Sequence, residues 1–404
     1  MPRTRRTPAP LPMLEHLPEV DRRLFLRGLG AAGLGLGGSS LLAACGTSGT
    51  KISAKDDCTS TDKSSTDKSM VWSNWPEYID VDGNRMPSLE KFQKESGIKV
   101  TYNTDVNDNN DFFAKVKNQL GACEPVGRDL FVLTDWMAEK MVNAGWLQKL
   151  DHGNMPNVEA NLVDNLKSPQ WDENRDYSVP WQSGFTGIAY NAKYTKPVGS
   201  FEELMTRKDL KGKVSLLKEM RDTMSFMLKL AGGDPTDFDD NAWGEAIDKL
   251  KGYVASGQVR RFTGNDYVDD LNKGDIVACE AWSGDVIAMQ FDNPDIKWVV
   301  PEEGLVIWSD NFLVPNKATH KANAEKLMNF YYDPANAAMV SAWVNYISPV
   351  KGTQEAMAKV DKTLVEEPLI FPSPDFLDKA FSFQATDDKT SEKYERDFQT
   401  AISA

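Results

Sequence analysis

From Met70 onward, short apolar segments alternate with stretches in which apolar residues recur every three or four positions. The predicted strands span 70–74, 98–102, 129–133, 187–190, 214–216 and 276–281. The first three strands are each followed by a helical face that ends near a glycine. Because strands alternating with helices of this length build parallel or mixed sheets, we predict an α/β protein with two lobes, of which 70–182 and 183–286 are the main parts.

The first 44 residues have the order of charge and apolar character that is typical of an export signal. Arg22 and Arg23 precede an uncharged run rich in Gly, Leu and Ala, and Leu42-Ala43-Ala44 stands directly before Cys45. This pattern resembles a lipobox and predicts cleavage before Cys45 with a lipid on its thiol. The paired arginines are typical of a twin-arginine signal, with an ordinary basic start as the alternative. A buried Cys at the end of an apolar helix explains the order of these segments less well.

The residues after the signal predict a tethered, acidic protein on the outer face of the cytoplasmic membrane. Residues 46–69 are almost all small, polar or charged, which predicts a flexible tether with a reach of about 25–30 Å. The whole chain has a net charge of −14, which disfavours nucleic acid and attracts cations. No second apolar run approaches the length of a membrane span.

The cysteines do not indicate a disulfide framework. With Cys45 lipidated, an odd number remains, namely Cys58, Cys123 and Cys279, and no pair has the CxxC spacing. Cys123 and Cys279 are therefore predicted to be small buried residues, while a single bridge stays open.

Sequence motifs for catalysis, metals and cofactors are missing. The chain has three His residues and no HExxH, GxSxG, Walker A or GxGxxG pattern. Residues 105–111 imitate the start of a calcium loop but lack its Gly, and Val116 stands where its Glu belongs. We interpret them as a polar turn that caps the next helix, and we predict no cofactor and no metal. A hydrolase that works with two carboxylates stays open.

Aromatic residues and carboxylates stand side by side at the ends of several predicted strands, where open α/β sheets bind ligands. These positions are Trp75, Glu77, Tyr78, Asp135, Trp136, Trp181, Glu219, Asp222, Trp282, Asp285, Trp308 and Asp310. Aromatic faces attract ammonium groups and cover methylene groups, and an ammonium taken out of water needs a carboxylate. A slot with aromatic walls and spaced carboxylates suits an extended polyamine. Each position alone is more often a core residue or a helix cap.

The chain resembles the spermidine/putrescine-binding lipoproteins of polyamine ABC transporters from about Met70 to its end. The resemblance rests on 74–78 (NWPEY), 129–132 (DLFV), 178–181 (SVPW), 282–285 (WSGD) and 307–310 (IWSD). It implies a type II periplasmic-binding-protein fold, an α/β fold of two lobes with a hinge and a cleft between them. One lobe would contain 70–182 and 287–331, and the other 183–286 and 332–404. The implied protein is a receptor, not an enzyme.

The resemblance also implies roles for single residues. Trp75, Tyr78, Trp136, Trp282 and Trp308 match aromatic lining residues, and Thr134 matches a hydroxyl of the first lobe. Glu77 matches an acid near one terminal amine, Glu219 and Asp222 match the pair for the other, Asp285 matches the central acid, and Asp310 matches a further lining residue. Pro76, Asp135 and the large Trp136 depart from the familiar pattern, as does the order of Glu219 and Asp222. These departures leave open the choice between spermidine and putrescine.

We therefore predict an exported, lipid-anchored polyamine receptor that passes its ligand to membrane permease subunits. A monomer suffices for this role. One alternative is a receptor of the same fold for a sugar, an opine or another organic cation, although the five cleft acids argue against a neutral sugar. The third possibility is a lipid-anchored carbohydrate hydrolase.

Overall fold

The structure, a computed structural model, describes residues 58–403. The predicted export signal and the lipidation site at Cys45 lie outside these residues. Within them, ten strands form one mixed sheet. The strands are β1 (Ser69–Ser73), β2 (Lys99–Asn103), β3 (Leu130–Thr134), β4 (Ser178–Asn191), β5 (Val214–Leu217), β6 (Val259–Thr263), β7 (Ala278–Trp282), β8 (Ile296–Val299), β9 (Leu305–Leu313) and β10 (Ala380–Phe381).

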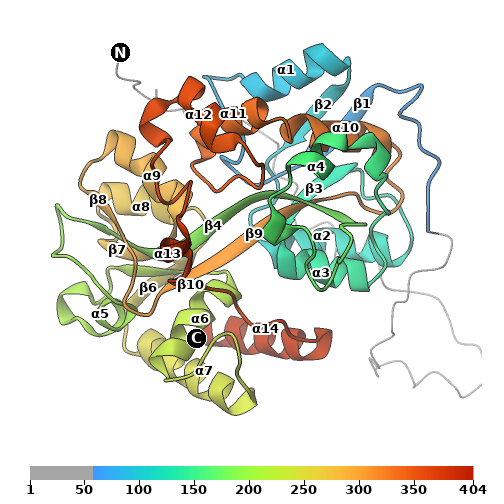
Figure 1. Ribbon diagram of the computed structural model, residues 1–404. Coiled ribbons are helices and arrows are strands. Elements are labelled where there is room, and N and C mark those ends of the chain that lie inside the picture. Colours follow the sequence, from blue (N-terminus) through green and yellow to red (C-terminus); the bar gives the residue numbers. More distant parts are fainter. Residues whose placement is uncertain (1–57, 404) are drawn as a thin grey trace, which may run out of the picture. The chain divides into compact units, whose positions relative to one another are not determined.

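Helices connect the strands and flank the sheet (Figure 1). They are α1 (Pro87–Ser96), α2 (Asn109–Gly121), α3 (Asp135–Asn143), α4 (Pro156–Asn161), α5 (Phe201–Thr206), α6 (Met220–Leu230), α7 (Asp240–Ala255), α8 (Tyr267–Lys273), α9 (Ser283–Asp292), α10 (Lys321–Tyr331), α11 (Pro334–Val344), α12 (Thr353–Val360), α13 (Pro374–Leu377) and α14 (Asp388–Ile402). Each of the six predicted strands overlaps an observed strand. The prediction of an α/β fold with a mixed sheet is confirmed.

Local sequence signals fix several helix ends. Helix α1 ends where Gly97 adopts the left-handed conformation, with φ at 70°, which glycine adopts without strain. Helix α2 begins after Asp108, whose carboxylate accepts a hydrogen bond from the Asp111 amide. This contact confirms the interpretation of 105–111 as a helix-capping turn.

The order of strands places two parallel groups on either side of a long antiparallel pair. The order is β2-β1-β3-β9-β4-β7-β5-β6, while β10 pairs with β9 and β8 pairs with β4. Strands β1, β2 and β3 are parallel, as are β5, β6 and β7. Strands β4 and β9 pair antiparallel from Ser178 opposite Leu313 to Thr186 opposite Val306 and run through the middle of the sheet (Figure 1). The two parallel groups are therefore joined by continuous strands.

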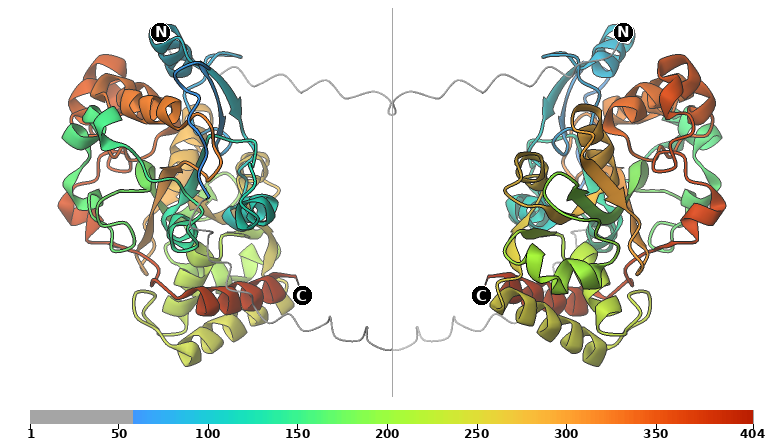
Figure 2. Two further views of the ribbon diagram at one scale, coloured as in Figure 1. Left: turned by 90° about the vertical axis from the view of Figure 1, so that its right-hand side faces the viewer. Right: turned by 90° about the vertical axis from the view of Figure 1, so that its left-hand side faces the viewer.

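Separate hydrophobic clusters surround the two groups of strands. One contains Trp72 of β1 and Phe92 of α1, and another contains Leu216 of β5 and Trp243 of α7. Helix α14 belongs to the second cluster and lies along α7 (Figure 2). Helix α11, however, packs in the first cluster through Val340, although the family resemblance assigns 332–404 to the other lobe. The division into two lobes stays a prediction.

The segment before β1 differs from the predicted flexible tether. The structure joins Cys58 to Cys123 by a disulfide, so Cys123 is not the small buried thiol that we predicted. The Lys63 amide donates to the Thr319 carbonyl over 2.7 Å, and the hydroxyl of Ser64 accepts from the Asn323 amide over 3.1 Å. The tether prediction is therefore wrong for residues 58–69, because backbone and side-chain contacts fix them to the body. Cys279 is buried with a free thiol, as predicted.

Candidate functional site

A cavity of about 660 Å³ opens where the ends of strands from both parallel groups meet. Its walls come from the loop after β1, from the starts of α3, α6 and α9, from β9, and from the segment between β10 and α14. Eleven of the twelve predicted ligand-binding residues line this cavity: Trp75, Glu77, Tyr78, Thr134, Trp136, Glu219, Asp222, Trp282, Asp285, Trp308 and Asp310. The structure thus brings together predicted residues from five separate parts of the sequence.

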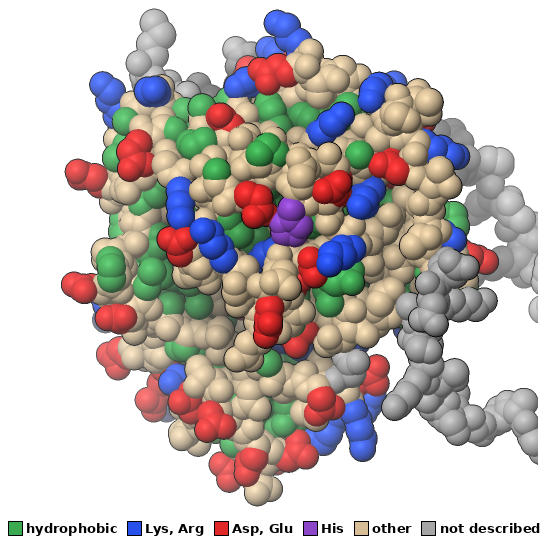
Figure 3. Space-filling model, turned by 45° about the vertical axis from the view of Figure 1, so that its right-hand side comes forward, with side chains coloured by type: hydrophobic (Ala, Val, Ile, Leu, Met, Phe, Trp, Pro, Cys, Tyr) green, Lys and Arg blue, Asp and Glu red, His purple; other side chains and the backbone are tan. Residues whose placement is uncertain are grey.

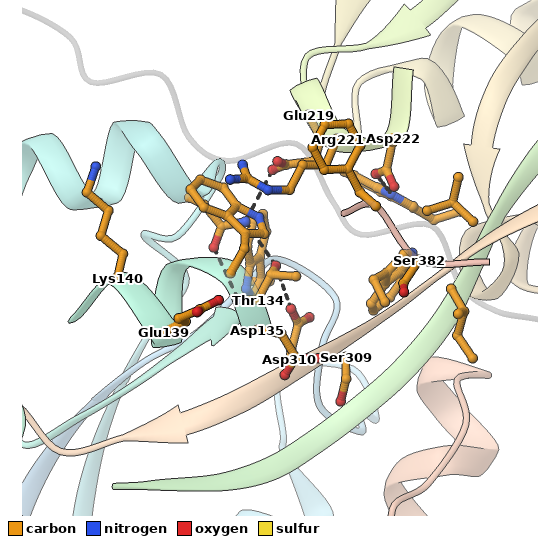
Figure 4. Close-up of a pocket in the computed structure, with 18 of the residues that line it drawn as sticks. Thr134, Asp135, Glu139, Lys140, Glu219, Arg221, Asp222, Ser309, Asp310 and Ser382 are labelled. Carbon is orange, nitrogen blue, oxygen red and sulfur yellow. Dashed lines mark hydrogen bonds between the residues drawn. The ribbon is translucent and has the colours of Figure 1, made fainter. Parts of the chain in front are cut away.

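Asp310 is held by two hydroxyl groups. It lies on β9 opposite Thr134 of β3 and is only 5% exposed. The Tyr78 hydroxyl donates to one carboxylate oxygen over 2.8 Å, and the Thr134 hydroxyl donates to the other over 2.7 Å. In Figure 4 the Asp310 side chain points toward Thr134, while Ser309 points to the other side of the strand, as strand alternation requires.

Asp285 lies in the first turn of α9 and accepts three hydrogen bonds from neutral groups. The Tyr267 hydroxyl and the Asn265 amide donate to Oδ2 over 2.7 and 2.9 Å, and the Tyr346 hydroxyl donates to Oδ1 over 3.2 Å. The ring of Tyr346 meets that of Tyr78 edge to face, with centroids 5.4 Å apart. Asp285 and Asp310 are therefore linked through two packed tyrosines.

Asp222 lies in the first turn of α6 and is fixed by side chains of the neighbouring strands β4 and β7. The Thr186 hydroxyl of β4 donates to Oδ1 over 3.0 Å, and the Trp282 indole donates to Oδ2 over 3.0 Å. The Trp308 indole in turn donates to the Thr186 hydroxyl over 3.1 Å. These bonds fix the orientation of two aromatic rings that line the cavity.

Glu219 is joined to the first group of strands by Asn109. The Asn109 amide nitrogen lies 3.2 Å from Glu219 Oε2 and 2.9 Å from the Thr134 hydroxyl oxygen. Glu219 Oε1 is buried and has no hydrogen-bond partner within residues 58–403. A hydrogen-bonded path therefore runs from Glu219 through Asn109 and Thr134 to Asp310.

Arg221 is a cation inside this acidic site. Its guanidinium carbon lies 3.6 Å from the centroid of the Trp136 ring and 5.7 Å from that of Phe383. Nη2 donates to the Ser391 hydroxyl over 2.9 Å, whereas the buried Nη1 has no hydrogen-bond partner in the described part of the chain. Figure 4 shows Arg221 and Glu219 together above Thr134, with Asp222 beside them.

Burial raises the pKa of the cavity carboxyl groups. Loss of hydration is the main cause for Asp222 and Asp285, whose pKa values rise to about 6, and for Asp310, whose pKa rises to about 7. Burial and the nearby Asp108 and Asp222 charges raise the pKa of Glu219 well above its ordinary value. The hydrogen bonds described above act in the opposite direction. Without a cationic partner, Asp222 and Asp285 therefore take up protons near pH 6 and Asp310 near pH 7.

The structure corrects one predicted site residue and adds others. Trp181 lies within β4, is 3% exposed and packs edge-on against Trp72 with ring centroids 5.7 Å apart, so the prediction that it contacts ligand is wrong. Sequence reasoning missed Asn109, Arg221, Asn265 and Tyr346, which line the cavity. Asn109 and Asn265 lie in polar stretches that are typical of turns. Arg221 lies between the predicted site residues Glu219 and Asp222, and this position could have identified it as a cavity residue.

The described residues show neither a candidate metal site nor a helix that could span a membrane. Residues 58–403 contain no group of three or more His, Cys, Asp or Glu placed to hold a metal ion. None of the helices in this part of the chain is long and apolar enough to cross a membrane. The face in Figure 3 carries acidic and basic side chains side by side. The cavity is therefore the strongest candidate site in the described chain.

A family model, curated relatives and a solved structure all relate this chain to solute-binding proteins. Residues 88–370 match the family model for bacterial extracellular solute-binding proteins. The spermidine/putrescine-binding periplasmic protein 1 of Haemophilus influenzae is 29% identical over 305 residues, 75% of this chain and 80% of that protein. A putrescine-binding periplasmic protein of Escherichia coli is 29% identical over 337 residues, 78% and 86% of the two chains. A solved structure from Listeria monocytogenes superposes with a TM-score of 0.73 at 26% identity, covering 83% of this chain and 98% of that one.

Proposed function

The chain belongs to the bacterial extracellular solute-binding protein family, and from this premise we propose that it binds a polyamine, spermidine or putrescine, in the described cavity. Proteins of this family are the solute-binding components of ABC transporters and are not enzymes. The names of the two relatives, one for spermidine and putrescine and one for putrescine, support a polyamine as the solute.

One observation carries the proposal: the buried carboxylates of the cavity are held by neutral donors. Asp285 and Asp310 accept hydrogen bonds from hydroxyl and amide groups, and neither forms an ion pair within residues 58–403. A buried carboxylate without a cation is unfavourable when ionised. A ligand ammonium would replace the proton and complete each site with a charge-assisted hydrogen bond.

The aromatic residues supply the rest of the recognition. Trp75, Trp282 and Trp308 are half-buried, and their indole nitrogens donate to the Val132 carbonyl, to Asp222 and to Thr186. With the nitrogens engaged, the ring faces are free to cover ligand methylene groups, at about 0.8 kcal/mol for each buried CH₂. A sugar would instead require many hydroxyl partners, and three buried carboxylates in one cavity match several ammonium groups better.

The cellular role follows from this chemistry. The receptor is exported, anchored on the outer face of the cytoplasmic membrane by a lipid on Cys45, and collects its ligand between two lobes. The lobes close over the polyamine by hinge bending, and permease subunits recognise the closed form. Glu77, the exposed member of the five predicted cleft acids, would then approach one end of the ligand.

The proposal is tested by titration calorimetry of the purified protein with spermidine, putrescine and a neutral disaccharide. We expect one-to-one binding of at least one polyamine and a decrease in affinity of about tenfold or more in Asp285→Asn, since a lost ammonium–carboxylate pair leaves a buried charge unpaired. Asp248→Asn is the matched control, because Asp248 is an exposed acid on α7 that is not among the residues that line the cavity.

Two results would contradict the proposal. If neither polyamine binds while the disaccharide does, the ligand is a sugar and the carboxylates have another role. If Asp285→Asn folds, as judged by circular dichroism, and binds polyamine as tightly as Asp248→Asn does, the central role of Asp285 is wrong.

A further inference from the structure

We propose that Arg221 is a built-in cation that occupies one end of the cavity and restricts the ligand to a diamine of putrescine length. The inference rests on the proposed function, because it concerns which polyamine the same cavity accepts. Three features carry it: Arg221 is held in place, it covers an aromatic face, and its charge lies beside the carboxylate that a third amino group would need.

Contacts on several sides hold the Arg221 side chain. Trp136 of α3 lies against one face of the guanidinium at 3.6 Å, and Phe383 lies 5.7 Å from it. Ser391 of α14 accepts a hydrogen bond from Nη2 over 2.9 Å. The planar guanidinium is therefore oriented by three residues from separate segments, which limits its freedom to move aside for a ligand.

The guanidinium takes the place that a terminal ammonium would need. At 3.6 Å it covers the face of Trp136, which an ammonium or methylene group of a longer ligand would otherwise contact. Glu219 is the carboxylate at this end of the cavity, and Arg221 is the cation that lowers its pKa and that of Asp222. An additional ammonium here would meet a like charge and would share its carboxylates with Arg221.

The other end of the site remains available for a diamine. The hydrogen-bonded path from Glu219 leads through Asn109 and Thr134 to Asp310, and the packed pair Tyr78 and Tyr346 continues it to Asp285. Asp310 and Asp285 both line the cavity. Two ammonium groups separated by a short methylene chain can pair with Asp310 and Asp285 without using the carboxylates beside Arg221.

The test compares putrescine and spermidine on the full-length wild-type protein, on Arg221→Met and on Lys229→Met by titration calorimetry. Methionine keeps an apolar side chain over Trp136 and removes the charge. Lys229 is a second cation of α6 that contacts Phe381 and is not among the cavity walls, so its replacement controls for the loss of one positive charge. We expect wild type to prefer putrescine by about tenfold or more. Arg221→Met should shift the ratio toward spermidine by about tenfold or more, and Lys229→Met should leave it unchanged.

If Arg221→Met does not fold, titration of the wild-type protein with N-propylputrescine and with spermidine tests the same inference. N-propylputrescine has a chain of nearly the length of spermidine but lacks its third amino group. If Arg221 acts through its charge, N-propylputrescine binds more tightly than spermidine.

Two outcomes overturn the inference alone: equal binding of spermidine and N-propylputrescine by wild type, or a folded Arg221→Met with the wild-type ratio. Binding of no polyamine by wild type would instead overturn the proposed function, and the inference with it.

Discussion

At the scale of single residues, the cavity combines acids that are hard to ionise with donors that are neutral. Asp222, Asp285 and Asp310 are buried, and their pKa values rise to about 6, about 6 and about 7 because burial removes water. Hydroxyl, amide and indole groups orient each carboxylate. The cavity is therefore suited to bind a cation, because ionising its buried carboxylates without a cationic partner is unfavourable.

This arrangement predicts that polyamine affinity decreases as the pH falls from 8 to 5. Amines keep their protons over this range, with pKa values of about 10, whereas the cavity acids take up protons as the pH passes through their pKa values. Each proton that must leave on binding weakens affinity by up to about tenfold per pH unit below that pKa. Calorimetry in two buffers of different ionisation enthalpy measures the number of protons released. Affinity that is constant from pH 5 to 8, with no proton release, would contradict the raised pKa values.

The same acids affect the stability of the ligand-free protein. Their pKa values are higher in the folded than in the unfolded chain, so the folded state binds more protons between about pH 4 and pH 7. Their contribution to the free energy of unfolding is complete below this window and is lost as the pH rises through it. The increase in melting temperature on adding putrescine should therefore be larger at pH 8 than at pH 5.

Part of the cavity lining could be predicted from the sequence. Motifs at strand ends identified eleven residues that line the cavity, because parallel strands bring their carboxyl ends to one edge. Whether each contacts ligand stays a prediction. Trp181 was misplaced because its neighbours in β4 gave no sign of which face the ring packs on. Arg221 and Tyr346 were missed because their positions depend on contacts between distant segments.

At the scale of secondary-structure elements, close packing between α9 and the loop after α11 positions the Asp285 site. A Cβ on Gly284 would lie 2.6 Å from the Val344 carbonyl oxygen and 2.6 Å from the Tyr346 ring. The Tyr346 hydroxyl donates to Asp285, so displacement of this ring would alter the cavity. Neither α9 nor α11 was predicted from the hydrophobic periodicity, and their close approach depends on the folded arrangement.

Gly284→Ala should therefore reduce both stability and polyamine affinity. Forcing a methyl group into this contact is expected to cost about 1–3 kcal/mol in the free energy of unfolding. Gly244→Ala is the matched control, because Gly244 lies in α7 with open space around it and alanine favours a helix by about 0.5–1 kcal/mol. Denaturant unfolding and titration calorimetry measure the two effects. If Gly284→Ala is as stable as Gly244→Ala, the close contact of Gly284 with Val344 and Tyr346 does not exclude a methyl group, and the prediction is wrong.

At the scale of the whole molecule, one sheet joins two groups of strands, and a disulfide fixes the segment before β1. Alternating strand and helix patterns predicted the α/β class and six of the strands. Cysteine spacing alone does not identify disulfide partners, so the Cys58–Cys123 bridge could not be predicted from the sequence. The position of α11 beside β1 and α1 likewise depends on contacts between residues far apart in the sequence.

Loss of this disulfide should lower stability without changing ligand affinity. The bridge closes a loop with a sequence separation of 65 residues, and such a link stabilises by about 2–4 kcal/mol. Neither cysteine is among the residues that line the cavity. Guanidinium unfolding of Cys58→Ser with Cys123→Ser, compared with wild type, measures the loss, and calorimetry measures affinity. A large loss of polyamine affinity in the folded variant would contradict this separation of roles.

The most direct test of the central claim is a crystal structure of the protein with putrescine. We expect one ligand molecule in the cavity, with one nitrogen within hydrogen-bond distance of Asp285 and the other beside Asp222 or Asp310. Its methylene groups should lie against Trp282 or Trp308, and Arg221 should remain stacked on Trp136. A cavity that stays empty at saturating putrescine, or nitrogens bound away from these carboxylates, would contradict the account.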